Sequence, residues 1–299
     1  MKNILKMIPE CIKRESTAIL SAHYNRLIKI KSEQHVWGGD INESAKISTS
    51  EGDFFLKWNN LLKFPKMFEY EALGLELLKK TNTFYIPEII GFSECNNYSF
   101  LLLEFINQKH KKHDFWEDFG IKLSKLHKNT SEFWGLENNN YIGSLQQQNF
   151  NHQNWKQFFI EERIEPMIKL ARDSNKIKCE ISFLFDQFFN KIDEIFPIEQ
   201  PALLHGDLWS GNLLCANDGY ACLIDPAVYY GHREMDIAMT KLFGGFDQVF
   251  LHSYNEAFPL EIGWKDRLDY YNLYPLMVHV NLFGGGYIYS VETILKRLS

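Results

Sequence analysis

Three polar residues in the second half of the chain have the types and spacing that phosphoryl transfer needs. In "LLHGDLWSGNLL" (203–214), Asp207 precedes Asn212 by five positions, and Asp225 follows a short apolar run. Phosphoryl transfer needs a base for the acceptor hydroxyl and hard oxygen ligands for Mg²⁺. We therefore predict Asp207 as the catalytic base and Asn212 and Asp225 as the magnesium ligands. His205 is expected to hold the turn through hydrogen bonds.

An upstream segment carries groups that could bind a nucleotide. Gly38 and Gly39 in "GGDIN" predict a glycine turn whose amides could cover phosphates. Lys57, at the end of an expected strand, could reach the α and β phosphates if a glutamate on the next helix orients it. Glu71 is preferred to Glu69 for this role, since the two lie about 200° apart around a helix and only one can face the lysine. Each feature alone is uninformative, but their order along the chain indicates a nucleotide site.

Apolar patterning predicts the elements that position these groups. Residues 17–58 read as strands with a hairpin turn at "SEGD". Residues 85–92 and 98–106 read as two further strands, and the second is nearly all apolar, so we expect it to be central. Residues 66–80 carry apolar side chains at the spacing of one helical face. The runs "PALL" and "YACLID" are expected to flank the Asp207 motif as a hairpin.

The chain after residue 107 is predicted to be mostly helical. Amphipathic helices are expected over 115–127, 155–171 and 181–196, with Pro166 kinking or dividing the second, and the tail over 234–299 is again helical. The predicted fold class is α+β, with two lobes. A nucleotide-binding lobe, residues 1–105, would hold a small antiparallel sheet and one main helix. A larger helical lobe, residues 106–299, would hold the catalytic loop and the acceptor site.

Composition narrows the class of protein. The 299 residues are 45% hydrophobic, enough for a substantial core, and the net charge of -6 argues against a nucleic-acid partner. The five cysteines are odd in number and form no CxxC pair, which favours a reducing compartment. The N-terminus lacks an apolar run of signal-peptide length, and polar residues interrupt the uncharged segment 270–291. We expect a cytoplasmic protein without a membrane partner, and the sequence does not indicate its oligomeric state.

Several longer segments together resemble one enzyme family. They are "LLHGDLWSGNLL", "LIDPAVYYGHREMDIAMTKLFGGF", "NNYIGS", "LFGGGYIYSVETIL" and "FFIEERIEPMIKLA". The chain resembles the fructosamine kinases, also called ketosamine-3-kinases, from "GGDIN" to the C-terminus. The HGDxxxxN pattern alone is shared with aminoglycoside phosphotransferases and choline kinases, whereas "HGDLWSGN" with "DPAVYYGHRE" is much narrower.

The resemblance implies a protein-kinase-like fold that uses ATP and Mg²⁺. It implies phosphorylation of the 3-hydroxyl of a ketosamine, either a small molecule or a glycated protein, after which the amine is released. Asp207 matches the family's base, Asn212 and Asp225 its metal ligands, and Lys57 with Glu71 its nucleotide-orienting pair. The hinge that meets adenine corresponds to the backbone of Glu104, Phe105 and Ile106. Pro226 after the metal aspartate makes a mobile activation segment unexpected.

Residues near the motif are candidates for the acceptor pocket. Trp209 offers an indole face that suits a sugar, but the same ring could pack against the loop. Glu234 or Asp236 could attract a cationic amine, although Asp236 is favoured as a partner of the catalytic-loop backbone. His279 is either a substrate contact or a core histidine. Further candidates follow the metal aspartate: Tyr229, Tyr230, His232 and Arg233.

Two rival functions stay open at this point. One is a kinase for an amino alcohol or an aminoglycoside, to which an acidic protein is equally suited. The other is an inactive nucleotide-binding module, which is disfavoured because every required residue type is present. The sequence does not choose between fructosamines and ribulosamines, or between free and protein-bound adducts.

Overall fold

The structure is a computed structural model that describes residues 7–36 and 41–298. Its helices are α1 (Glu10–His23), α2 (Met67–Lys80), α3 (Phe115–His127), α4 (Trp155–Phe158), the π-helical η1 (Phe159–Ile164), α5 (Glu165–Asp173), α6 (Cys179–Ile195), the 3-10 helix η2 (Ser210–Asn212), α7 (Glu234–Leu242), α8 (Gln248–Ala257), α9 (Trp264–Tyr271), α10 (Leu273–Phe283) and α11 (Tyr287–Lys296). Its strands are β1 (Ser32–His35), β2 (Glu43–Ser48), β3 (Asp53–Asn60), β4 (Ile89–Cys95), β5 (Tyr98–Glu104), β6 (Asn140–Ile142), β7 (Leu145–Gln147), β8 (Ala202–Leu204), β9 (Leu213–Cys215), β10 (Ala221–Leu223) and β11 (Tyr229–Gly231).

The first part of the chain is built on an antiparallel sheet with the strand order β1-β2-β3-β5-β4. On β5, Phe100 and Leu102 join the cluster that contains α1, whereas Leu101 and Leu103 join the large core that contains α2. Because successive strand residues point to opposite faces, a strand covered on both faces must be apolar throughout. The continuous apolar run therefore correctly predicted an internal strand.

Helix α1 corrects the prediction that residues from 17 onward form strands. Ile12 and Leu20 are fully buried against the sheet, but Ser16 between them is buried too. The polar Ser16 interrupts the apolar stripe by which an amphipathic helix is recognised. The helix packs closely on β4, where a Cβ at Gly91 would lie 2.9 Å from Ile19.

Helix α2 lies where the sequence predicted it and connects the sheet to the rest of the molecule. Its apolar face, including Ala72 and Leu75, is buried in the large core. A Cβ at Gly74 would lie 3.1 Å from Val228, so this face also approaches the loop that follows Asp225. The helix thus lies beside the loop after Asp225, and it brings Glu71 to the lysine that contacts Asp225.

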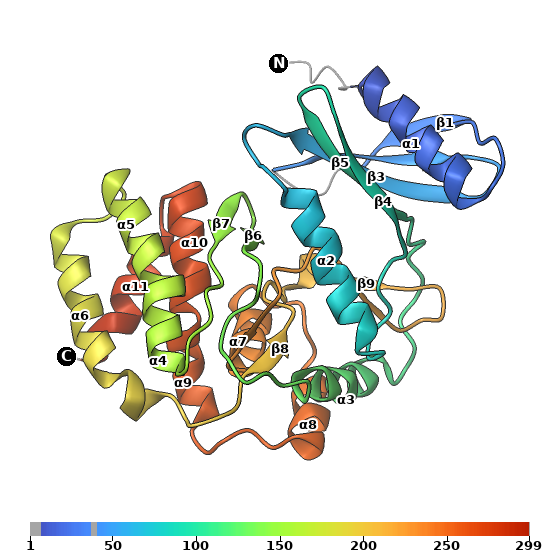
Figure 1. The fold of residues 1–299 in the computed structure, drawn as a ribbon. Coiled ribbons are helices and arrows are strands. Elements are labelled where there is room, and N and C mark those ends of the chain that lie inside the picture. The colour runs from blue at the N-terminus through green and yellow to red at the C-terminus, as the bar shows by residue number, and fades with distance from the viewer. Residues whose placement is uncertain (1–6, 37–40, 299) are drawn as a thin grey trace.

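The second part of the chain is mainly helical, as predicted. In Figure 1 the sheet and α1 form one end of the molecule, and α5, α6, α10 and α11 form the other. The confirmed fold is α+β and kinase-like, with a small antiparallel sheet lobe and a helical lobe. No helix in the described part of the chain is both long enough and apolar enough to span a bilayer.

Pro166 divides the predicted helix over 155–171, as expected. It stands in the first turn of α5, directly after the π-helical turn η1, in which the Glu165 N–H donates to the Ile160 carbonyl. A proline has no N–H to donate and its ring clashes with the carbonyl four residues earlier, here that of Glu162. The wider π turn relieves this clash.

Two short strand pairs, rather than one hairpin, frame the Asp207 motif. Strand β8 pairs with β11 and β9 pairs with β10, so "PALL" and "YACLID" do not pair with each other as predicted. The Ala227 N–H donates to the His205 carbonyl (2.9 Å), and the Ile224 N–H donates to the Asn212 carbonyl (3.1 Å). This arrangement holds the turn with Asp207 against the turn with Asp225.

Candidate active site

The turn before Asp207 is fixed by a buried carboxylate. Asp236 accepts hydrogen bonds from the backbone N–H groups of His205 (2.8 Å) and Gly206 (3.0 Å), the structural role favoured for it. Gly206 has a φ of +81°, and a Cβ there would lie 2.0 Å from the Ala227 carbonyl oxygen. Only glycine fits this position, which explains the central residue of the His-Gly-Asp sequence.

His205 holds the same turn as a neutral side chain. Its Nδ1 accepts the Asp207 N–H (3.3 Å) and its Nε2 donates to the Ile224 carbonyl (3.0 Å). Burial lowers the pKa of His205, which keeps the imidazole in the neutral form that can both accept and donate. The predicted positioning role is confirmed.

Asn212 orients Asp207 and keeps an oxygen available. Its amide nitrogen donates to the carbonyl and to Oδ2 of Asp207, both at 2.9 Å. All three side-chain hydrogen bonds of Asn212 among the described residues use the amide nitrogen, so its Oδ1 is left for another ligand. Asp225, with a φ of +51°, exposes 44% of its side chain. One amide and one carboxylate oxygen are hard ligands suited to Mg²⁺.

Lys57 joins three separate elements at one point. Its Nζ lies 2.6 Å from Asp225 Oδ1 and also pairs with Glu71 Oε1, while Glu69 pairs with Lys66 instead. The preference for Glu71 as the lysine partner is confirmed. Burial lowers the pKa of Lys57, but the charges of Asp225 and Glu71 outweigh burial and raise it, so the ammonium stays charged.

The predicted hinge, residues 104–106, has one backbone N–H group without a hydrogen-bond partner among the described residues. The N–H of Glu104 donates to the Glu88 carbonyl (2.9 Å) and that of Phe105 to the Asp53 carbonyl (3.3 Å). The Ile106 N–H has no hydrogen-bond partner among the described residues. Of the three backbone amides predicted to lie at the adenine hinge, only that of Ile106 is therefore free to form a further hydrogen bond. The glycines predicted to cover the phosphates, Gly38 and Gly39, lie outside the described residues.

Asp207 is predicted to set the acid limb of the pH profile. Burial raises its pKa to about 7, the charges of Asp225 and Asp236 add to the shift, and hydrogen bonds from Asn212 and Trp209 oppose it. A base must be deprotonated, so kcat/KM for the acceptor should fall about tenfold per unit below about pH 7. Added Mg²⁺ should move this limb to lower pH, because a cation favours the charged carboxylate. Steady-state rates between pH 5 and 9 measure both effects, and a flat profile would contradict the assignment.

Trp209 both covers the loop and keeps an exposed surface. A Cβ at Gly211 would lie 2.2 Å from the indole, so the ring lies over the glycine backbone. The ring also meets Phe243 edge-on, with centroids 6.2 Å apart, yet 39% of Trp209 is exposed. Phe243 in turn contacts His279 at 4.8 Å, and burial lowers the pKa of that half-buried histidine. Trp209 and His279, both predicted substrate contacts, are therefore linked through Phe243 in one row of rings.

Three predicted substrate contacts belong to the core instead, namely Tyr229, His232 and Glu234. Tyr229 is fully buried beneath the Arg163 guanidinium, 3.9 Å from the ring centroid. His232 stacks on Trp155 with its Nδ1 2.7 Å from the Tyr271 hydroxyl.

Glu234 has no exposed side-chain surface. It forms a two-bond ion pair with Arg267 at 2.6 and 2.7 Å. Buried charge with a fixed partner cannot serve an incoming amine, so the prediction for Glu234 is wrong, as are those for Tyr229 and His232. Tyr230 is half-buried on β11, opposite Leu203.

Sequence reasoning missed two residues that hold the turn after Asp225. Asn140 on β6 donates to the Val228 carbonyl (2.8 Å), and Gln147 on β7 donates to the Ala227 carbonyl (3.1 Å). Both carbonyls directly follow Asp225 and Pro226 in the chain. The "NNYIGS" segment contributed to the family resemblance, but nothing in it indicated a contact with this turn.

The fold and the site together define a phosphotransferase with a protein-kinase-like architecture. A family model described as "Fructosamine kinase" matches residues 12–299. The chain belongs to the fructosamine kinase family.

Individual relatives agree with this membership. A protein of Enterococcus faecium named "Probable ketoamine kinase" is 38% identical over 265 residues, covering 88% of this chain and 93% of that protein. The chloroplastic protein-ribulosamine 3-kinase of Arabidopsis thaliana is 37% identical over 268 residues, covering 87% and 80%. The crystal structure of a Haemophilus somnus protein provisionally named fructosamine-3-kinase superposes with a TM-score of 0.87 at 28% identity, covering 95% and 96%.

Proposed function

We propose that this protein transfers the γ-phosphoryl group of Mg-ATP to the 3-hydroxyl of a ketosamine. The observation that carries the proposal is the meeting of Lys57, Asp207, Asn212 and Asp225, which come from separate elements, within direct hydrogen-bonded contacts. The family relatives named for ketoamines and ribulosamines support the choice of acceptor. We assign residues 1–105 to the nucleotide-binding lobe and residues 106–299 to catalysis and acceptor binding.

Each residue has a distinct part in the proposed reaction. Asp207 accepts the proton of the attacking hydroxyl, and Asn212 holds that carboxylate in place through its amide. Lys57 exchanges Asp225 for the nucleotide phosphates, which leaves Asp225 and the Asn212 oxygen to hold Mg²⁺. The ion supplies neutralisation of phosphate charge. The charged lysine and the pre-set turn work mainly by positioning and electrostatics.

The products explain why such a reaction serves repair. A ketosamine 3-phosphate is labile and releases its amine, so phosphorylation of an adduct on lysine restores the unmodified side chain. The exposed indole of Trp209 gives the sugar an apolar face beside the base. Five free cysteines suit a reducing, cytoplasmic setting.

A substrate panel tests the function. Purified protein with Mg-ATP should release ADP when given a fructosylated or ribosylated lysine derivative, free or in a protein. Choline and an aminoglycoside serve as comparison acceptors, because related kinases with the same fold act on such cations. Robust turnover of either one with none on any ketosamine would overturn the proposal. No turnover on the whole panel, with ATP bound, would instead favour an inactive nucleotide-binding module.

The role of Trp209 can be measured separately from that of the loop. Replacing Trp209 by Ala should raise KM for the ketosamine about tenfold while leaving KM for ATP nearly unchanged, since one apolar platform contributes about 1–1.5 kcal/mol. Gly211→Ala places a methyl group where the indole now lies and so displaces the ring. This variant should also raise KM for the ketosamine. Tyr289→Ala, at an exposed tyrosine on α11, is the matched control. An unchanged KM in both loop variants would show that the indole does not touch the acceptor.

A further inference from the structure

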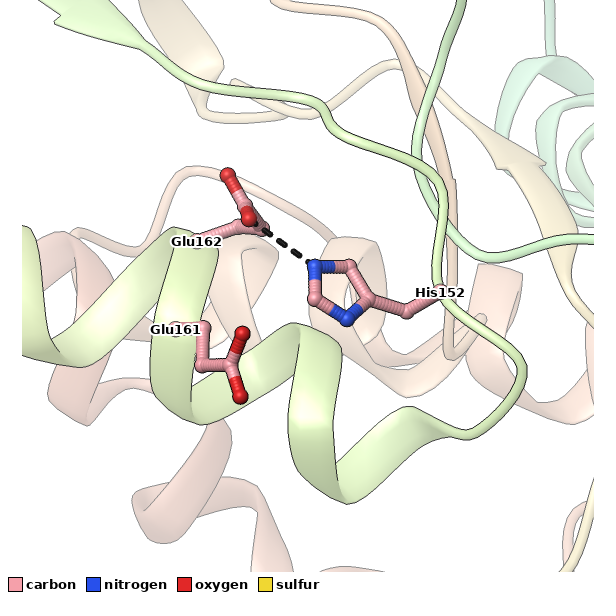
Figure 2. A group of neighbouring side chains, drawn as sticks. All are labelled: His152, Glu161 and Glu162. Carbon is pink, nitrogen blue, oxygen red and sulfur yellow. Dashed lines mark hydrogen bonds and ion pairs between the residues drawn. The ribbon is translucent and has the colours of Figure 1, made fainter.

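A histidine lies against two adjacent glutamates of the π-helical turn η1, and none of the three is a proposed active-site residue. The His152 Nε2 and Glu162 Oε1 atoms are 2.9 Å apart, and one ligand atom from each of His152, Glu161 and Glu162 lies within 4.8 Å of the others. Figure 2 shows both carboxylates on the side of the helical turn that faces the imidazole. Among residues 7–36 and 41–298, this is the one such group of three or more potential ligands.

Glu162 is buried, and one of its two carboxylate oxygens has no hydrogen-bond partner among the described residues. Only 6% of the Glu162 side chain is exposed, and its Oε2 has no hydrogen-bond partner among the described residues. A buried carboxylate oxygen without a partner is unfavourable, because it has lost water and gained nothing in return. A cation beside the carboxylate would satisfy it.

The scaffold holds the histidine firmly while leaving one side open. The backbone of His152 exchanges two hydrogen bonds with Trp134, at 2.9 and 3.1 Å. Glu162 is held by the turn that Pro166 imposes. Glu161 is exposed, so its carboxylate can reach an ion from the solvent side. Two ligands are thus rigid, and the third can adjust.

The donor set identifies the class of ion. We propose that His152, Glu161 and Glu162 bind a divalent transition-metal ion, with Zn²⁺ as the best match. An imidazole with two carboxylates suits zinc, whereas Mg²⁺ prefers an all-oxygen shell. Tetrahedral ligands about 2.1 Å from zinc lie about 3.4 Å apart. The hydrogen-bonded pair of His152 and Glu162, now at 2.9 Å, would therefore open by about 0.5 Å on binding zinc. The Glu161 ligand atom, which lies within 4.8 Å of the other two, would close in by at most about 1.4 Å.

The bound ion has a structural role. It joins the irregular segment that carries His152 to the π turn, and the neighbouring Arg163 supports Tyr229 beneath the catalytic loop. Two carboxylates balance the charge of a divalent ion, so no further anion is required. Metal binding at this site does not require the acceptor and is measured separately from kinase activity.

The test is a Co²⁺ and Zn²⁺ titration of the metal-free full-length protein in excess Mg²⁺. One equivalent of Co²⁺ should bind with weak visible absorption and no thiolate charge-transfer band, and Zn²⁺ should displace it. Glu161→Gln, Glu162→Gln and His152→Asn should each weaken binding by at least about tenfold, the loss caused even by an outer-shell change. Circular dichroism verifies that each variant is folded.

The matched control is His252→Gln. His252 pairs with Glu256 at 3.3 Å on an exposed face, and no third potential ligand joins them among the described residues. This variant should bind the metal like the parent protein. Absence of saturable binding, a thiolate band, or unchanged affinity in Glu161→Gln would each overturn the proposal. Because Glu161 is exposed, its variant decides the matter even if the buried variants fail to fold.

Discussion

The Asp207→Asn variant is expected to lose about 10²–10⁴-fold in turnover while ATP affinity stays nearly the same. The amide has the shape of the carboxylate but cannot accept the hydroxyl proton, and a positioned base contributes a factor of this size. Nucleotide binding depends on Lys57 and the metal ligands, which the substitution leaves in place.

Two measurements separate chemistry from binding in this variant. ADP release with a saturating ketosamine gives turnover, and a fluorescence titration gives the affinity for ATP. Asp173→Asn, at an exposed position on α5, is the control for removing one negative charge. If the Asp207 variant keeps more than about a tenth of the parental turnover, another group is the base.

The Arg267→Met variant is expected to lower the free energy of unfolding by about 3–5 kcal/mol. Glu234 has no exposed side-chain surface, and Arg267 is its ion-pair partner. Removing one member of a buried pair leaves an uncompensated charge in the core. By contrast, KM for the ketosamine should not change in the protein that remains folded, because Glu234 does not line the acceptor site.

Urea denaturation at neutral pH measures this loss. The double variant Glu234→Leu, Arg267→Met should recover much of it, since replacing both charges removes the buried ion. Lys296→Met breaks an exposed pair with Glu292 and should change stability by no more than about 0.5 kcal/mol. If Arg267→Met lowers the free energy of unfolding only slightly, or raises KM for the ketosamine strongly, Glu234 is a substrate contact after all.

Much of the fold could be predicted because its elements carry strong local patterns. The bounds of α3 match the prediction, and α2 and β5 match within a few residues. The failures have specific causes. A buried Ser16 hid the helical stripe of α1, and the pairing of β8 with β11 depends on partners that adjacent sequence does not specify.

The site residues, too, were predicted correctly in one part and incorrectly in another. Lys57 and Glu71 meet as predicted, because strand alternation and helical periodicity determine which face each presents. The residues after Asp225 were harder, since nearly all of them are buried in the core although the segment is rich in polar and aromatic side chains. Nothing in "YYGHRE" distinguishes the half-buried Tyr230 from the fully buried Tyr229.

The sequence by itself determined the chemistry. The spacing of Asp207, Asn212 and Asp225 is a local property of one turn and two short strands, and the residues between the first two define the family. Tertiary structure decided which neighbouring polar groups are buried in the core and so unavailable to a substrate. Arg267, which neutralises Glu234, lies 33 positions away, so its effect depends on packing of distant helices. Trp209 shows both contributions: its place in the loop is local, whereas Phe243 and the exposed indole face come only from the folded chain.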